Sequence, residues 1–143
     1  MNILKKIALI TVALGCTFQV QAFEKKQMVL ANVFWGTWSI YNAQNKCTET
    51  YQFKKPGQFQ YTSKLKSMSG NFSVMRNTDL KTLDILTMKV NTDNKKASCA
   101  QASKDFTGQT LSLGLKWVSQ NTAQICSDTE GKQCSSLYLI KQK

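Results

Sequence analysis

The sequence has 143 residues, enough for one domain, and its formal net charge at pH 7 is +11. It contains no histidine, which excludes Ser-His-Asp and Cys-His catalytic sites and any catalytic pair of histidines. Glycine-rich loops for phosphates or dinucleotides are also missing, so we expect no cofactor. The 8 carboxylates are dispersed and mostly fall in expected turns. The composition therefore favours a binding protein over an enzyme.

Residues 1–22 have the pattern of a secretory signal peptide. Two lysines precede an apolar run over residues 7–15, and Val20 and Ala22 place small side chains three and one positions before a cut. The run is far shorter than the ~20 residues that span a bilayer. Lipidation at Cys16 is the alternative, because a partial lipoprotein box precedes it. The pattern favours free export, to the periplasm or beyond, and both alternatives take the chain out of the cytoplasm.

The exported part, residues 23–143, is strongly basic. Removing the first 22 residues takes away two of the 19 basic residues and none of the 8 acidic ones, so 17 minus 8 leaves a net charge of +9. Such an excess predicts an anionic partner, either a lipid head group or an acidic protein; the alternative is an ordinary solvated surface. Export argues against a nucleic acid partner. The best local group of basic residues surrounds the first expected hairpin turns: Lys54, Lys55, Lys64 and Lys66.

Apolar residues recur with a period of two from residue 33 onward. In "TLSLGLKWV", Leu111, Leu113, Leu115 and Trp117 share one side of a strand, whereas a helix would scatter them. Residues 24–32 before the first strand predict a helical turn. The alternation and the turn residues predict strands over 33–41, 46–54, 58–66, 70–76, 80–91, 108–118, 120–126 and 133–141.

Eight consecutive strands with mostly short connections predict an all-β, antiparallel up-and-down arrangement. Closing such a sheet into a barrel removes its exposed edges, so we favour a barrel, with a β-sandwich as the alternative. The longest connection, over residues 92–106, is polar and predicts either a loop or a short helix. Neither a repeat nor a linker composition interrupts residues 23–143, which we take as one domain.

Four cysteines remain after removal of the signal peptide, and an even count in an exported domain predicts two disulfides. Cys126 and Cys134 flank a polar turn between two expected strands, so we favour a bridge between them. Cys47 then pairs with Cys99. A zinc site is the alternative use of these cysteines, but residues 23–143 contain neither histidine nor a Cys-x-x-Cys motif, so we expect no metal. The wide spacing also argues against a redox-active pair.

The tripeptide "GTW", Gly36 to Trp38, resembles the Gly-x-Trp start of lipocalins and related small β-barrels. In that family the tryptophan plugs the closed end of the barrel, and a basic residue of the last strand packs over its ring. The resemblance assigns that place to Lys141. Small periplasmic barrels that inhibit bacterial proteases start similarly, with a disulfide-bonded cysteine after the first strand, as Cys47 would be. The alternative is an ordinary core tryptophan beside a tightly packed glycine.

The sequence leaves open which way two side chains point, those of Trp35 and Glu49. In an extended chain Trp35 points away from Trp38, toward either the surface or the lumen. Glu49 shares a face with Tyr51 and Phe53, so it lies inside the barrel or else points outward beside a lysine; we favour the outward orientation.

We therefore expect an exported, non-enzymatic β-barrel with a basic surface that binds an anionic membrane or an acidic protein, including an enzyme that it inhibits. The alternative is a lipocalin-like carrier that holds a small apolar ligand in the barrel. The candidate residues for lining its cavity are Trp35, Tyr51, Phe53, Phe59, Tyr61, Leu113 and Leu115.

Overall fold

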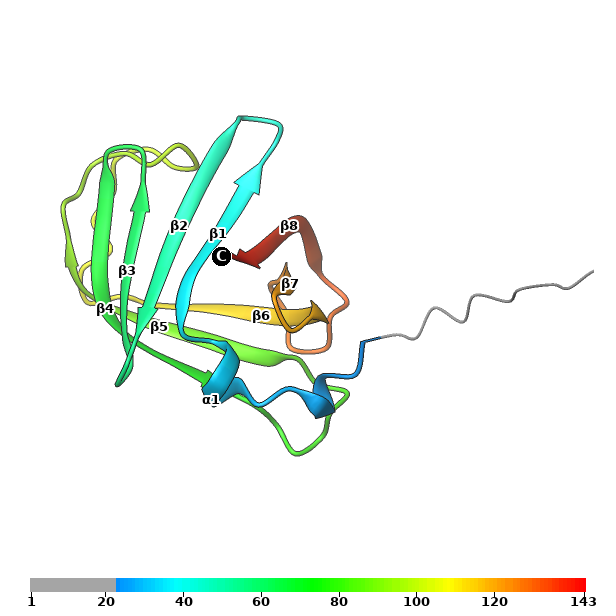
Figure 1. Ribbon diagram of the computed structural model, residues 1–143. Helices are drawn as coiled ribbons and strands as arrows, with labels where there is room; N and C mark the ends of the chain where they lie inside the picture. The colour runs from blue at the N-terminus through cyan, green and yellow to red at the C-terminus, as the bar shows by residue number, and fades with distance from the viewer. Residues whose placement is uncertain (1–22) are drawn as a thin grey trace, which may run out of the picture.

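The computed structural model describes residues 23–143, so the predicted signal peptide and Cys16 lie outside the described residues. Eight antiparallel strands form one closed barrel in which each strand pairs with the next and β8 returns to β1 (Figure 1). The predicted up-and-down barrel is confirmed, and the sandwich alternative is wrong. The strands are β1 (Gly36–Asn42), β2 (Cys47–Lys54), β3 (Gln58–Ser63), β4 (Lys66–Met75), β5 (Asp84–Asp93), β6 (Thr110–Ser119), β7 (Thr122–Cys126) and β8 (Cys134–Lys141).

Two short helical pieces precede β1 at one end of the barrel, which we call the base (Figure 1). They are the 3-10 turn η1 (Lys25–Gln27) and the helix α1 (Leu30–Val33), where the sequence predicts a single helical turn. We call the opposite end, which carries the β1–β2 and β3–β4 turns, the mouth. Among residues 23–143, no helix is both long enough and apolar enough to span a membrane.

The alternation of the sequence matches the inside and outside of the barrel. In β3, Phe59, Tyr61 and Ser63 are buried and the residues between them are exposed. In β6, Leu115 and Trp117 are buried on the side that Leu111 and Leu113 share. A strand that turns one face toward a closed core and the other toward water buries alternate residues, which explains the predicted pattern.

The boundary between β3 and β4 differs from the prediction. The chain turns at Lys64, which has a positive φ of 56°, and at the exposed Leu65. These residues carry no glycine or asparagine signal for a tight turn, so the sequence pattern missed it. Gly70, expected near a strand boundary, lies within β4 beside a register shift. A Cβ atom there would lie 1.9 Å from the carbonyl oxygen of Lys89, so the close approach of β5 requires glycine.

Trp38 plugs the base. Its side chain is fully buried, it stacks on Phe34 with ring centroids 5.4 Å apart, and its Nε1 donates to the Phe34 carbonyl oxygen at 2.8 Å. Lys141 pairs with Trp38 across β1 and β8, and its Nζ lies 5.7 Å from the centroid of the Trp38 ring. Gly36 opens β1 with a φ of 118°, which glycine tolerates. The predicted arrangement of these residues is confirmed, as expected of a lipocalin-like barrel.

Both predicted disulfides are present. Cys126 and Cys134 close the β7–β8 hairpin over a sequence separation of 8, with Cα atoms 3.9 Å apart. Cys47 and Cys99 are separated by 52 residues, with Cα atoms 5.3 Å apart. This second bridge ties the start of β2 to residues 94–109, which connect β5 to β6 and which we call the mouth segment. The segment contains no regular helix, so the loop alternative is correct.

Candidate functional site

A cavity of about 420 Å³ lies between the mouth segment and the packed base. This mouth cavity is partly open to solvent, and each of the eight strands contributes at least one residue to its lining. Its walls are mainly apolar, with a few polar groups. The lining residues are Ile40, Glu49, Tyr51, Tyr61, Lys66, Met68, Met88, Ser98, Gln101, Phe106, Thr110, Leu111, Ser112, Leu113, Ile125 and Leu137.

The two sides of the mouth cavity differ in chemistry. On one side Tyr51 and Tyr61, cross-strand partners in β2 and β3, pack edge to face with ring centroids 5.0 Å apart. On the other side Leu111, Leu113 and Ile125 of β6 and β7 are partly exposed. Partly exposed aliphatic side chains on the inside of a closed barrel offer apolar surface to a ligand.

Lys66 lies inside the barrel, contrary to the prediction that it belongs to a basic surface. It is 3% exposed, and its Nζ lies 2.8 and 2.9 Å from the two carboxylate oxygens of Asp93. The same Nζ donates to the carbonyl oxygens of Lys104 at 2.8 Å and Lys96 at 3.3 Å. These bonds hold both halves of the mouth segment, which explains why a lysine is buried here.

Lys66 and Asp93 together hold the mouth segment, and we call this buried pair the clamp. Burial alone would raise the pKa of the Asp93 carboxyl group, but hydrogen bonds from Lys66 and from the backbone N–H groups of Phe106 and Lys95 together lower the pKa below its ordinary value. Asp93 therefore stays ionised as the buried partner of Lys66. The pair fixes the mouth segment at its two ends, and the bridge between Cys47 and Cys99 adds a third attachment.

Glu49 lines the mouth cavity, so the outward orientation that we favoured from the sequence is wrong. Its Oε1 accepts a hydrogen bond from the Tyr61 hydroxyl at 2.7 Å. Burial and then this bond raise the pKa of Tyr61; burial and then the Glu49 charge raise that of Tyr51. Both tyrosines therefore remain neutral beside the carboxylate. Alternation placed Glu49 on the same face as Tyr51, which was the available signal for an inward orientation.

The remaining predicted basic residues do not gather in one place. Lys54 and Lys55 lie at the β2–β3 turn near the base, and Lys64 lies at the β3–β4 turn near the mouth. The whole length of β3 separates the two groups. The ends of a short strand are close in sequence but lie at opposite ends of a barrel. With Lys66 buried, the predicted four-lysine cluster does not exist as one surface.

Of the seven residues predicted to line a cavity, Tyr51, Tyr61 and Leu113 do line the mouth cavity. Phe53, Phe59 and Leu115 are instead buried in the core below it, each at most 1% exposed. Trp35 is half-buried at the base, where its ring meets Phe72 edge to face at 5.6 Å and Lys55 Nζ lies 5.7 Å from its centroid. Depth along each strand, which alternation does not reveal, separates the two groups.

A charged network at the base was missed by sequence reasoning. Asp84, fully buried, accepts hydrogen bonds from Arg76 Nη2 at 2.7 Å, Trp117 Nε1 at 2.8 Å and Lys25 Nζ at 3.3 Å. Arg76 also donates to the Met28 carbonyl oxygen at 2.6 Å, which ties the N-terminal segment to the barrel. Arg76 is the single arginine of the sequence, a signal that could have marked a planar, bidentate partner for a carboxylate.

A second, open groove of about 430 Å³ lies outside this network at the base. Lys26, Lys81 and Lys116 are exposed along it, beside the exposed apolar side chains of Phe23 and Leu80. We call it the base groove. Its complete lining is Phe23, Glu24, Lys25, Lys26, Leu80, Lys81, Thr82, Leu83, Leu115, Lys116, Trp117 and Glu130.

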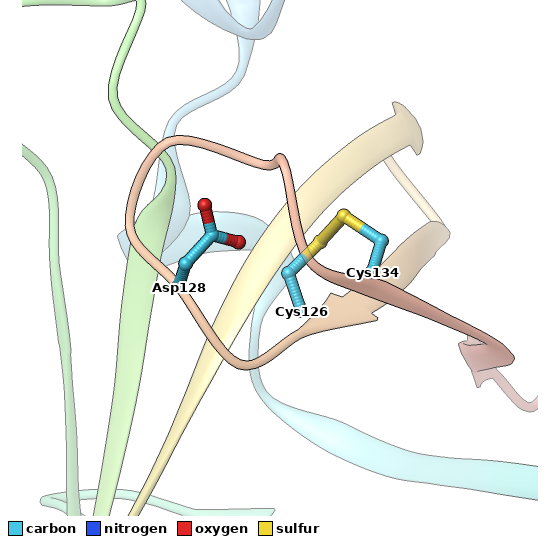
Figure 2. A group of neighbouring side chains, drawn as sticks. All are labelled: Cys126, Asp128 and Cys134. Atoms are coloured by element: carbon cyan, nitrogen blue, oxygen red, sulfur yellow. A yellow bond between two sulfur atoms is a disulfide. The ribbon is translucent and has the colours of Figure 1, made fainter.

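The loop between β7 and β8 brings Cys126, Asp128 and Cys134 together, as Figure 2 shows. The two sulfur atoms are joined in a disulfide and therefore offer no thiolate to a metal. The Asp128 carboxylate accepts hydrogen bonds from the backbone N–H of Gln133 at 3.0 Å and of Lys132 at 2.9 Å, and these bonds lower its pKa. These contacts shape a hairpin loop.

Comparison of the chain with family models, with curated proteins and with solved structures finds no match in any of the three.

Proposed function

We propose that the protein is an exported, non-enzymatic carrier that binds a small, mostly apolar ligand in the mouth cavity. The observation that carries this proposal is the cavity of about 420 Å³ on the inside of the closed barrel. Ligand sites commonly measure about 300–1,000 Å³ and combine apolar walls with a few placed polar groups. Tyr51, Leu111 and Leu113 supply such walls, and Glu49 supplies a polar group. Lipocalins, which the Gly-x-Trp start resembles, carry ligands at the same end of the barrel.

The absence of histidine from the sequence and the engagement of Asp84 and Asp93 in buried ion pairs support a role in binding rather than catalysis. Two disulfides are compatible with an oxidising compartment. Together with the predicted signal peptide, they support a periplasmic or extracellular location.

Native mass spectrometry of the protein purified gently from its own exported fraction tests for natural cargo. We expect an adduct of roughly a few hundred daltons that is lost on denaturation, the size of ligand that such a cavity holds. Titration with the fluorescent probe N-phenyl-1-naphthylamine then tests the cavity itself, because its emission rises in an apolar site. We expect saturable binding at one site per chain.

A matched pair of variants on β6 locates the probe. Leu113→Trp places a large side chain inside the mouth cavity, and we expect it to weaken probe binding at least about tenfold. Val118→Trp introduces the same side chain on the same strand at an exposed position and should leave binding unchanged. Equal binding by both variants would contradict the proposal.

The base groove supports a second candidate function, attachment to an anionic membrane surface. It places three exposed lysines beside exposed Phe23 and Leu80, which suits contact with acidic head groups and the apolar layer below them. The Lys26→Ser, Lys81→Ser and Lys116→Ser triple variant should lose binding to vesicles that contain phosphatidylglycerol. A triple variant of Lys54, Lys55 and Lys64 changes the net charge equally outside the groove and serves as the control.

Vesicle co-sedimentation measures this binding at low salt and near 1 M salt, where the Debye length is ~3 Å. We expect the wild-type protein to bind at low salt and to dissociate at high salt. If both triple variants lose binding to the same extent, diffuse positive charge rather than the groove is responsible.

A further inference from the structure

The two charged side chains that line the mouth cavity differ in how many hydrogen bonds they already make within the protein. Among the described residues that line it, the charged ones are Glu49 and Lys66. Lys66 Nζ has three hydrogens and four acceptors within 3.3 Å, two of them the carboxylate oxygens of Asp93. Its positive charge is thus neutralised by Asp93, and it has no donor left for a ligand. An anionic ligand would find no available cation on these walls.

The Glu49 carboxylate, by contrast, is mostly free of hydrogen bonds within residues 23–143. Its Oε1 accepts one hydrogen bond, from Tyr61, and within residues 23–143 no donor reaches its Oε2. No lysine or arginine nitrogen in this part of the chain lies within 4.0 Å of the Glu49 carboxylate. A carboxylate can accept about four hydrogen bonds, so most of its capacity remains available to a ligand.

The neighbouring aromatic rings favour the same sign of charge. Tyr51 and Tyr61 stay neutral, so they add hydroxyl groups and negative ring faces but no compensating cation. Electron-rich ring faces attract ammonium groups, and this attraction grows when the site is partly shielded from water. The aliphatic wall of Leu111 and Leu113 faces a different part of the same cavity. The cavity therefore pairs one acceptor-rich end with one hydrocarbon side.

We propose that the ligand of the mouth cavity is a small cationic amphiphile, an apolar amine whose ammonium group binds Glu49 and whose hydrocarbon part packs on Leu111, Leu113 and Ile125. This inference rests on the proposed carrier function and adds the ligand's chemical class. The net charge of +9, from 17 basic and 8 acidic residues in the exported part, does not oppose it strongly. Exposed lysines are screened beyond about 10 Å at 0.1 M salt, whereas a charge inside the cavity is screened less.

Three ten-carbon probes that differ in the head group test the proposal: decylamine, decanol and decanoate. Decylamine is an ammonium ion at neutral pH and decanoate is an anion. Each competes with N-phenyl-1-naphthylamine, which is uncharged at that pH, at concentrations below micelle formation. We expect decylamine to compete best and decanoate worst, with about a tenfold or greater difference between them, the value of one charge-assisted hydrogen bond.

Substitution of the carboxylate assigns the preference. Glu49→Gln should lower the affinity for decylamine at least about tenfold and leave the affinity for decanol unchanged. Tyr61→Phe removes the hydroxyl that binds Glu49 but keeps the charge, so it should retain the preference for decylamine; near-ultraviolet circular dichroism checks the fold of both variants. Equal competition by all three probes, or an unchanged preference in Glu49→Gln, overturns the inference while the carrier function stands. Failure of N-phenyl-1-naphthylamine to bind the wild-type protein overturns the carrier function itself.

Discussion

At the base of the barrel Asp84 accepts hydrogen bonds from three side chains, whereas at the mouth Glu49 accepts one. Both carboxylates lie inside the barrel, Asp84 on β5 and Glu49 on β2, yet the first is fully buried and the second is partly exposed. A buried carboxylate must be paired to offset its desolvation, whereas a carboxylate in an open cavity keeps part of its hydration. The charges at the base are therefore buried and paired, whereas the mouth keeps a carboxylate in contact with solvent.

Packing differs between the two ends in the same sense. At the base, Phe34, Trp38 and Trp117 lie within 5.4 to 6.3 Å of one another, measured between ring centroids. At the mouth, Leu111 and Leu113 remain partly exposed around a cavity of about 420 Å³. Removing atoms from a close-packed interior lowers the free energy of unfolding, whereas removing atoms from the wall of an existing cavity lowers it less. Four predictions test this difference, in order of decreasing effect.

Removing the plug should have the largest effect. Trp38→Ala is expected to lower the free energy of unfolding by about 3–5 kcal/mol, because the side chain is fully buried among aromatic rings. Urea denaturation of the oxidised protein measures the loss. Trp35→Ala, at a half-buried position of the same base, should cost clearly less. A loss below about 1 kcal/mol for Trp38→Ala would show that the tryptophan does not close the barrel.

The two disulfides should differ in how much each adds to the free energy of unfolding. Loop-closure entropy gives about 4 kcal/mol for the bridge between Cys47 and Cys99, with a sequence separation of 52, and about 2.5 kcal/mol for Cys126 and Cys134, with a separation of 8. Replacing each pair by alanines and comparing urea midpoints measures both values. Equal losses would contradict the entropic account and would point to structure that persists in the unfolded chain.

Leu115 and Leu113 lie two residues apart on the inner side of β6 but at different depths. Leu115→Ala, at a fully buried position, should cost about 3 kcal/mol of unfolding free energy. Leu113→Ala enlarges a cavity that is already open and should cost less than about 1 kcal/mol. Thermal or urea unfolding distinguishes them. Similar losses would show that the mouth is packed as tightly as the base.

The smallest expected effect is a loss of unfolding free energy at acid pH, through the pair of Lys66 and Asp93 at the mouth. The pKa of Asp93 is lower in the folded protein than its ordinary 3.8, so its stabilisation is complete above that pH and is lost as pH falls through the folded value. Asp93→Asn should therefore flatten the dependence of unfolding free energy on pH below 3.8. Part of the dependence should remain, because hydrogen bonds from Thr107 also lower the pKa of Asp105, to about 2. An unchanged slope would contradict the role of Asp93.

Alternation along the strands predicted much of the fold. The predicted strand over 108–118 corresponds to β6 at Thr110–Ser119, because a half-buried strand repeats every two residues whatever surrounds it. The disulfide between Cys126 and Cys134 was also predictable, since a hairpin places its two flanking residues opposite each other. The resemblance of the Gly-x-Trp start to lipocalins placed Lys141 of the last strand over the Trp38 ring, as the structure shows.

The candidate site was predicted only in part. Tyr51, Tyr61 and Leu113 were correctly placed inside the cavity, but Phe53 and Leu115 share their faces and lie in the core. Alternation gives the side of a strand and leaves the depth along the barrel open. The predicted strand over 58–66 extends past the end of β3 at Ser63, so the sequence pattern missed both the turn at Lys64 and the inward orientation of Lys66.

Local period and spacing are enough to predict the strand number, the inward face of most strands and the bridge between Cys126 and Cys134, whereas the residues that plug the base follow from the resemblance of the Gly-x-Trp start to lipocalins. Which charges are paired depends on how the chain folds in three dimensions. Lys66 reaches Asp93 from 27 residues away, and Arg76 and Lys25 converge on Asp84. Closing the barrel brings these groups together and leaves Glu49 in the mouth cavity with Tyr61, because burial and distance, which no linear pattern encodes, set the energy of each charge.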